Sequence, residues 1–266
     1  MNAPESASVA EPVVLSRASA GVVQLTLNRP QQFNALSEQM LAALEAELAR
    51  IAADRSARVV VIAGAGKAFC AGHDLKQMRA NPRLEYYQQL FADCARVMRR
   101  IQTLPQPVIA RVHGIATAAG CQLVAMCDLA VAAEEARFAV SGINAGLFCS
   151  SPSVPLSRNV GRKQAFEMLV TGDFIDARTA LARGLVNQVV ALADLDQAVA
   201  HLAAQITAKP ALAVAMGKEL FYRQLEMGIE AAYQLAGQTM ACNMIADVAQ
   251  EGVDAFIHKR APNWPG

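Results

Sequence analysis

The segment Lys67-Ala68-Phe69-Cys70-Ala71-Gly72-His73-Asp74-Leu75-Lys76 is followed, about fifty residues later, by Ala116-Thr117-Ala118-Ala119-Gly120-Cys121-Gln122-Leu123. Each segment runs from apolar residues that favour a strand, through a turn of small residues, into the start of a helix. Two such turns can direct two backbone N–H groups at one carbonyl oxygen, which is the geometry of an oxyanion hole. The pair therefore predicts a site for an oxygen that gains negative charge.

The chain around these segments alternates strands with helices. Residues 13–27 alternate as a hairpin, and residues 59–63 and 108–112 are short apolar runs typical of strands buried on both faces. Helical periodicity covers the residues after Ser37, a plausible N-cap, and again residues 84–102. This order predicts an α/β fold with parallel pairing and right-handed connections.

The character of the sequence changes to helices after Pro152. We divide the chain into a flexible tail at residues 1–12, an α/β core at residues 13–200 and a helical region at residues 201–266. The apolar stretches of the last region exceed what one compact layer needs. We therefore expect these helices to pack against neighbouring subunits in an oligomer.

Composition excludes several classes of protein. The 266 residues are 54% hydrophobic and 18% charged with a net charge of +1, which predicts a globular protein with a sizeable core. The charge balance argues against nucleic-acid binding, and the longest apolar runs are too short for a membrane span. The six cysteines form no C-x-x-C pair, and no His, Cys or carboxylate cluster has metal-ligand spacing. The acidic, polar tail resembles no targeting signal, so we expect a cytoplasmic protein.

Further motifs in order along residues 13–259 resemble the crotonase family, which is the enoyl-CoA hydratase/isomerase superfamily. They are Leu27-Asn28-Arg29-Pro30 with Asn34-Ala35-Leu36, the two segments quoted above, Cys127-Asp128-Leu129-Ala130, Gly184-Leu185-Val186-Asn187, and Gln250-Glu251-Gly252 with Lys259. Each motif alone is weak, but their joint order and spacing are specific. Within the family, residues 141–150 are similar to the branch of enoyl-CoA hydratase domain-containing protein 3.

The resemblance implies a ClpP/crotonase-like spiral of ββα turns with a C-terminal helical trimerisation region, and a homotrimer or homohexamer. It implies an acyl-CoA thioester as the substrate, with no separate cofactor and no metal. The family stabilises an enolate-like intermediate with two backbone N–H groups, which would belong here to His73 and Ala119. The position of Ala119 agrees, because unpaired N–H groups and the helix dipole favour negative charge at a helix start.

The same resemblance suggests where coenzyme A would bind. The backbone of Gln31, Gln32 and Phe33 and the turn that contains Ala71, Asp74, Leu75 and Lys76 would hold pantetheine and adenine. Lys259 would supply a cation for a phosphate of coenzyme A. Without the family match, Lys76 and Lys259 would be interpreted as solvated surface lysines.

The acid and base of a hydratase are missing from the sequence. The two glutamates of the family's hydratases correspond here to Gln122 and Gly142, and a third carboxylate position of other members corresponds to Ser150. Glutamine can orient water but cannot transfer a proton, glycine offers only space, and a serine without a base is a poor proton-transfer group. Efficient hydration is therefore not expected.

Other residues are weaker candidates for proton transfer. The His73 side chain could enter the acyl pocket, but we favour local packing. Asp74 is expected to cap a helix, and Asp128 to bond to the backbone. Three functions stay open: an acyl-CoA lyase or isomerase of the hydratase/isomerase type, a non-catalytic acyl-CoA-binding pseudoenzyme, and a thioesterase-like enzyme.

Overall fold

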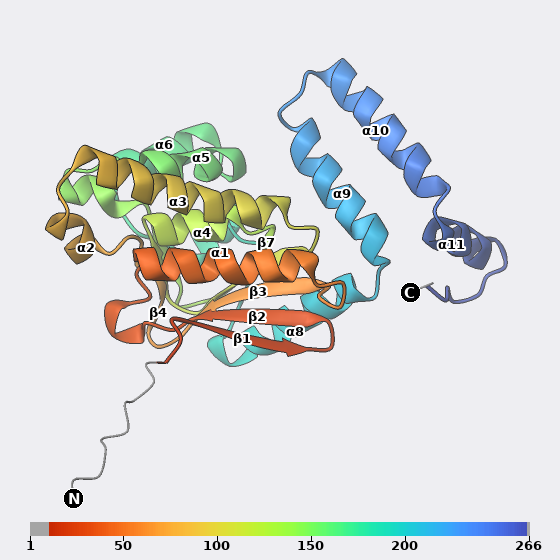
Figure 1. Cartoon of the computed structure of the whole chain (residues 1–266), viewed down its shortest axis with the longest axis horizontal. Helices are drawn as coiled ribbons and strands as arrows, with labels where there is room; N and C mark the ends of the chain where they lie inside the picture. The colour runs from red at the N-terminus through yellow and green to blue at the C-terminus, as the bar shows by residue number, and fades with distance from the viewer. Residues whose placement is uncertain (1–10, 265–266) are drawn as a thin grey trace, which may run out of the picture.

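The computed structural model describes residues 11–264 of the chain (Figure 1). Successive pairs of strands are each divided between two sheets. The first strand of each pair enters a six-stranded sheet of order β1-β2-β3-β5-β7-β10, and the second enters a four-stranded sheet of order β4-β6-β8-β9. The pairs are β3 (Val59–Gly64) with β4 (Ala68–Cys70), β5 (Val108–Val112) with β6 (Ile115–Thr117), and β7 (Leu129–Ala133) with β8 (Arg137–Ala139). This is the spiral of ββα turns, so the predicted fold class is confirmed.

The pairing of the strands follows the sequence pattern. The predicted hairpin is present as β1 (Val14–Ser19) and β2 (Val22–Leu27), which pair antiparallel. From β2 onward the large sheet is parallel and ends at β10 (Gln188–Val190). The short β9 (Ile175–Asp176) pairs antiparallel with β8.

Helices cover the sheets and follow the predicted apolar faces. The helix predicted at residues 84–102 is α3, and it buries one apolar face: Leu90, Cys94, Val97, Met98 and Ile101. The helices of the body are α1 (Glu38–Ala53), α2 (Leu75–Ala80), α3 (Leu84–Thr103), α4 (Ala119–Met126), α5 (Ser150–Asn159), α6 (Arg162–Thr171) and α7 (Ala177–Ala182), with 3-10 turns η1 (Pro30–Gln32), η2 (Ser141–Ala145) and η3 (Leu192–Asp194). Ser37 caps α1 as predicted, because its side chain accepts the Met40 N–H.

The predicted boundary at residue 200 is wrong, because it falls inside α8 (Leu195–Thr207). This helix buries Leu195, Val199 and Ala203 in a cluster with side chains of the large sheet, so it belongs to the core. The periodicity of a helix reveals its apolar face but not the partner of that face. Of the predicted tail, residues 1–10 lie outside the described part of the chain.

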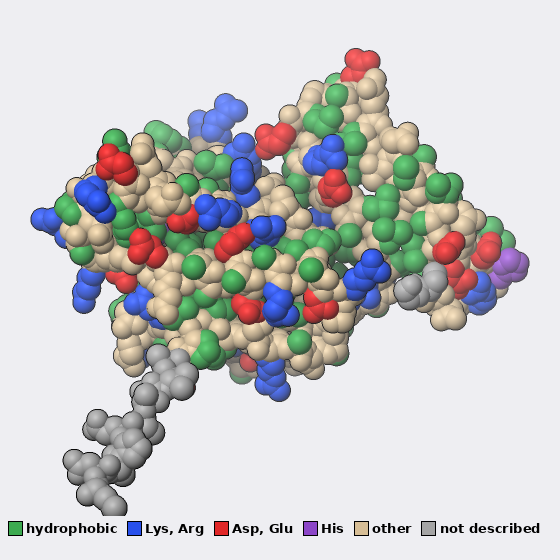
Figure 2. Space-filling model, viewed as in Figure 1, with side chains coloured by type: hydrophobic (Ala, Val, Ile, Leu, Met, Phe, Trp, Pro, Cys, Tyr) green, Lys and Arg blue, Asp and Glu red, His purple; other side chains and the backbone are tan. Residues whose placement is uncertain are grey.

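Three helices form an arm that projects from the body (Figure 1): α9 (Ala211–Gln224), α10 (Ile229–Met244) and α11 (Asp247–Ile257). Figure 2 shows hydrophobic side chains along this arm. Large exposed ones include Phe221, Ile229, Tyr233, Ile245 and Phe256. Within residues 11–264 no single helix is long and apolar enough to cross a membrane. The helical segments 192–207 and 211–224 have the required length and hydropathy only when taken together, and the chain bends by 102° between them.

Candidate functional site

The two quoted segments meet because β4 and β6 are parallel neighbours. Cys70 is the register partner of Ala116, so the turns that follow these strands leave the sheet side by side. At the contact, Gly72 has φ +90°, and a Cβ on it would lie 2.9 Å from Ala118 Cβ and 3.1 Å from Ala119 N. Glycine is required here both by its backbone conformation and by this close approach.

Ala119 is the first residue of α4, so its N–H has no acceptor within the helix. Ala118, just before it, has φ 50° and ψ −120°, a conformation that is unfavourable for any residue except glycine. The torsion ψ of Ala118 sets the plane of the peptide that carries the Ala119 N–H. The strained conformation of Ala118 therefore sets the orientation of the Ala119 N–H group.

The His73 N–H is left free by the way its neighbours pair. Leu36 and His73 form an isolated parallel bridge, in which the Leu36 N–H donates to the Gly72 carbonyl at 2.7 Å. In a parallel bridge of this kind, Leu36 is the residue that bonds to the neighbours of His73. The N–H of His73 itself therefore points away from Leu36. Among residues 11–264, neither the His73 nor the Ala119 backbone N–H has a hydrogen-bond acceptor.

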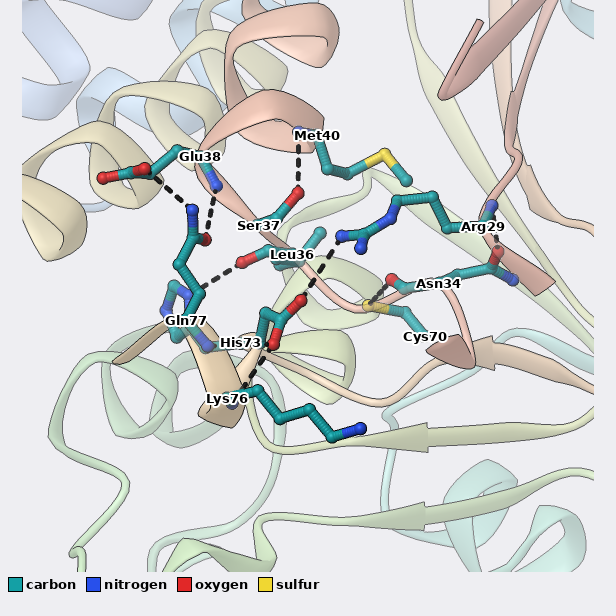
Figure 3. A network of polar contacts seen from close by, with 11 residues as sticks. Arg29, Asn34, Leu36, Ser37, Glu38, Met40, Cys70, His73, Lys76 and Gln77 are labelled. Atoms are coloured by element: carbon teal, nitrogen blue, oxygen red, sulfur yellow. Dashed lines mark hydrogen bonds and ion pairs between the residues drawn. The ribbon is translucent and has the colours of Figure 1, made fainter. Parts of the chain in front are cut away.

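The His73 side chain packs locally, the arrangement that we favoured from the sequence. Its Nδ1 lies 3.3 Å from the Leu36 carbonyl oxygen, and because a carbonyl only accepts, this nitrogen carries the proton (Figure 3). The ring also meets Phe91 edge to face, with centroids 5.5 Å apart. Burial lowers the pKa of His73, so the ring is neutral at neutral pH.

Gln122 is buried, with 5% of its surface exposed, and its Oε1 has no partner within the described residues. It lies three residues after Ala119 on α4 and so shares a face with it. Helical side chains lean toward the N-terminus, which brings the Gln122 amide toward the turn. An orphaned buried oxygen of this kind calls for a water molecule or a ligand as its partner.

The position of Gly142 has no room for a side chain. A Cβ there would lie 2.5 Å from the Leu147 carbonyl oxygen and 2.7 Å from Cys149 Sγ. The loop is closed by bonds from Leu147 N to the Gly142 carbonyl (3.0 Å) and from Gly142 N to Cys149 Sγ (3.3 Å). The sequence interpretation of Gly142 as open space is therefore wrong. Ser150 lies exposed at the start of α5, where its Oγ bonds to the Phe148 carbonyl.

Neutral groups line these segments. Residues 116–122 and 141–151 contain no Asp, Glu, His, Lys or Arg. Thr117 Oγ1 and Ser141 Oγ share a hydrogen bond of 2.7 Å. Burial raises the pKa of Cys121 to about 12 and also raises the pKa of Cys149, so both thiols stay protonated. Within residues 11–264, no group of three or more His, Cys, Asp or Glu side chains is arranged to hold a metal.

The residues predicted to contact coenzyme A fall into two groups. Gln31, Gln32 and Phe33 are exposed, and the Phe33 carbonyl accepts the Ala71 N–H at 3.0 Å, which joins this segment to the His73 turn. Leu75 and Lys76 are exposed on α2 beside that turn.

Asp74 has a structural role in the isolated chain. It caps α2 by accepting the N–H groups of Lys76 and Gln77, and it pairs with Arg29 at 3.5 Å. Lys259 follows the C-cap of α11, and Figure 1 shows α11 at the end of the arm, far from α2. A single chain therefore brings together the segments 31–33 and 71–76 but not Lys259.

Asn34 is the residue whose importance sequence reasoning missed. It is fully buried behind the His73 turn, and its amide bonds to four backbone groups. Its signal in the sequence was its place in the family-like motif at residues 34–36, which carries no obvious chemistry.

Comparison with known proteins gives concordant matches. The family model described as enoyl-CoA hydratase/isomerase matches residues 17–266. A Xenopus laevis protein named "Enoyl-CoA hydratase domain-containing protein 3, mitochondrial" is 44% identical over 95% of this chain and 86% of its own length. A solved Mycobacterium smegmatis enoyl-CoA hydratase is 66% identical with a TM-score of 0.94, covering 96% of this chain and 99% of that one. The solved human enoyl-CoA hydratase domain-containing protein 3 is 41% identical with a TM-score of 0.92, covering 95% and 100%.

Proposed function

Since the chain belongs to the enoyl-CoA hydratase/isomerase family, we propose that it binds an acyl-CoA thioester with the carbonyl oxygen between the N–H groups of His73 and Ala119. The observation that carries this proposal is the contact of Gly72 with Ala118 and Ala119, beside two N–H groups that lack acceptors among residues 11–264. Donors fixed in advance around a developing oxyanion need no reorganisation during the reaction.

The reaction at this carbonyl proceeds without a protein carboxylate. Gln122 can orient a water molecule through its amide, whereas Gly142 contributes nothing and Ser150 lies exposed without a paired base. Hydration or double-bond isomerisation would therefore be slow compared with a hydratase that has both glutamates. A proton carrier in this site comes from water or from the substrate itself.

The remaining predictions concern partners. Coenzyme A would lie along residues 31–33 and 71–76, and Lys259 would reach its phosphate from another subunit of a homotrimer or homohexamer. The exposed apolar side chains of the arm support this self-association, since they would be covered by a second copy. A nucleic-acid partner and a separate cofactor are not proposed. A cytoplasmic location stays a prediction.

Two measurements test the proposal. Calorimetric titration should show that acetyl-CoA binds more tightly than free coenzyme A, because only acetyl-CoA has the thioester carbonyl that would accept from the two N–H groups. Crotonyl-CoA turnover, followed by the loss of enoyl absorbance, should be at least about a hundredfold slower than in an ordinary hydratase, the loss typical of a missing general acid or base. Equal affinities for the two ligands would contradict the carbonyl site.

A non-catalytic acyl-CoA-binding protein is the second candidate. The blocked Gly142 position favours it, because the loop at residues 141–149 leaves no place for the second carboxylate. Binding without any turnover would support this candidate. Release of free thiol from acyl-CoAs would instead support the third candidate function, a thioesterase-like enzyme.

A further inference from the structure

The Asn34 side chain joins three parts of the chain that meet behind the candidate site. Its Oδ1 accepts the Arg29 backbone N–H at 3.0 Å. Its Nδ2 lies 2.8 Å from the carbonyl oxygens of both Ala65 and Ala68, and 3.2 Å from that of Phe69. The amide is buried and its polar atoms are all bonded, so it links the segment after β2 to both ends of the β3–β4 connection.

The backbone around Asn34 then holds the turn that carries the His73 N–H. Segment 33–36 contacts residues 70–73 one after another, and Figure 3 shows the contacts of Cys70 with Asn34 and of His73 with Leu36. The contacts are Cys70 Sγ–H to the Asn34 carbonyl (3.2 Å), Ala71 N to the Phe33 carbonyl (3.0 Å), Leu36 N to the Gly72 carbonyl (2.7 Å) and His73 Nδ1 to the Leu36 carbonyl (3.3 Å). The position of the His73 turn is thus set by segment 33–36.

Segment 33–36 has a conformation that needs support from a side chain. Phe33 and Asn34 are consecutive left-handed residues, with φ 50° and 56°. Asparagine tolerates this region better than most residues, but two such residues in succession are costly without bonds that fix them. The Asn34 amide supplies those bonds, and no backbone group in the segment could replace its two N–H donors.

We propose that Asn34 is a positioning residue for the thioester carbonyl. Through segment 33–36, Asn34 fixes the His73 N–H that would face this carbonyl. The inference rests on the proposed function, because it concerns the N–H group that would face the carbonyl oxygen. Asn34 does not touch the ligand. It determines where one of the two donors lies.

The substitution Asn34→Asp separates this role from simple packing. Aspartate has almost the same shape, but its ionised carboxylate has no N–H to give and would face the carbonyl oxygens of Ala65, Ala68 and Phe69. The segment should shift, and the His73 N–H with it. When the carboxyl group is protonated it regains one donor, so acid should partly restore the site.

The measurement is the infrared carbonyl stretch of acetyl-CoA labelled with ¹³C at the thioester carbon, free and bound to the full-length protein. Hydrogen bonds from both N–H groups should lower the stretching frequency in the wild-type complex. Asn34→Asp should lose most of this shift above neutral pH and regain part of it in mild acid. Asn81→Asp is the matched control, since among residues 11–264 Asn81 Nδ2 bonds only to the Gln77 carbonyl at the end of α2.

The outcomes are distinct. An unshifted carbonyl in the wild-type complex overturns the proposed function and the inference with it. A wild-type shift that survives in folded Asn34→Asp above neutral pH overturns the inference alone. If Asn34→Asp does not fold there, the neutral and smaller Asn34→Ser replaces it, and a full carbonyl shift in that variant has the same meaning.

Discussion

Lys218 Nζ lies 2.6 Å from Asp128 Oδ2, and this buried ion pair fastens the arm to the body. The ammonium group also donates to the carbonyls of Ile101 and Gln106, both at 2.9 Å. Tyr222 of α9 donates to the other oxygen of Asp128 at 2.7 Å. Asp128 thus has the backbone-bonding role expected of it, through the Val108 N–H, and a second role in the arm that the sequence did not reveal.

Replacing Lys218 by Met should destabilise the protein by about 3–5 kcal/mol, because it leaves the buried Asp128 carboxylate without its cation. The free energy of unfolding in urea measures this loss. Lys218→Met combined with Asp128→Asn should lose less than the two single changes added together, since the pair is removed as a unit. The exposed pair Arg223–Glu219 on the same helix is the control, and Arg223→Met should cost at most about 1 kcal/mol.

Restoring glutamate at both hydratase positions should not restore hydration. Gly142→Glu forces a side chain against the Leu147 carbonyl and Cys149 Sγ, so it should cost about 1–3 kcal/mol and displace the loop. Crotonyl-CoA turnover and thermal unfolding of Gln122→Glu, Gly142→Glu and the double variant measure both effects. Ser150→Glu, at an exposed position nearby, should leave stability nearly unchanged. A double variant with wild-type stability and rapid hydration would refute the steric argument.

Relief of strain at Ala118 should be measurable. With φ at 50°, alanine pays a conformational cost that glycine does not, so Ala118→Gly should be neutral or stabilising by up to about 1 kcal/mol, despite the greater freedom of glycine in the unfolded chain. Urea unfolding gives the sign. The same change at exposed Ala42 inside α1 should destabilise by about 1 kcal/mol. Equal losses at both positions would show that Ala118 is unstrained.

Local patterns predicted most of the fold but only part of the site. The caps Ser37 and Asp74 and the hairpin at residues 13–27 depend on neighbours in sequence, and all of them are present. The blocked Gly142 depends on Leu147 and Cys149 folding back over it, which no periodicity encodes.

The missed role of Asn34 has the same cause. Its amide acts through carbonyls about thirty residues away in the sequence, and any polar side chain in a turn gives the same local signal. The chemistry of the site was therefore predictable where it depends on residue type, and unpredictable where it depends on tertiary contacts.

Stability should fall in mild acid partly because of His113. Its Nε2–H donates to the Gly66 carbonyl at 2.9 Å, while Nδ1 is buried with no partner among residues 11–264. Burial lowers the pKa of His113, and nearby Arg111 adds to this effect. The unfolded state, in which the pKa is about 6.5, then binds the proton more readily. The contribution of His113 is therefore complete above that pH and is lost as the pH falls through the lower folded value.

His113→Gln should flatten this pH dependence, because glutamine can keep a donor toward Gly66 but does not titrate. The free energy of unfolding in urea, measured from neutral pH down to mild acid, gives the slope for each variant. Part of the slope should remain, since burial also lowers the pKa of His73. The same substitution at exposed His201 on α8 is the control. If His113→Gln keeps the full wild-type slope, the buried Nδ1 is not the proton-sensitive group, and the acid loss must come from other residues.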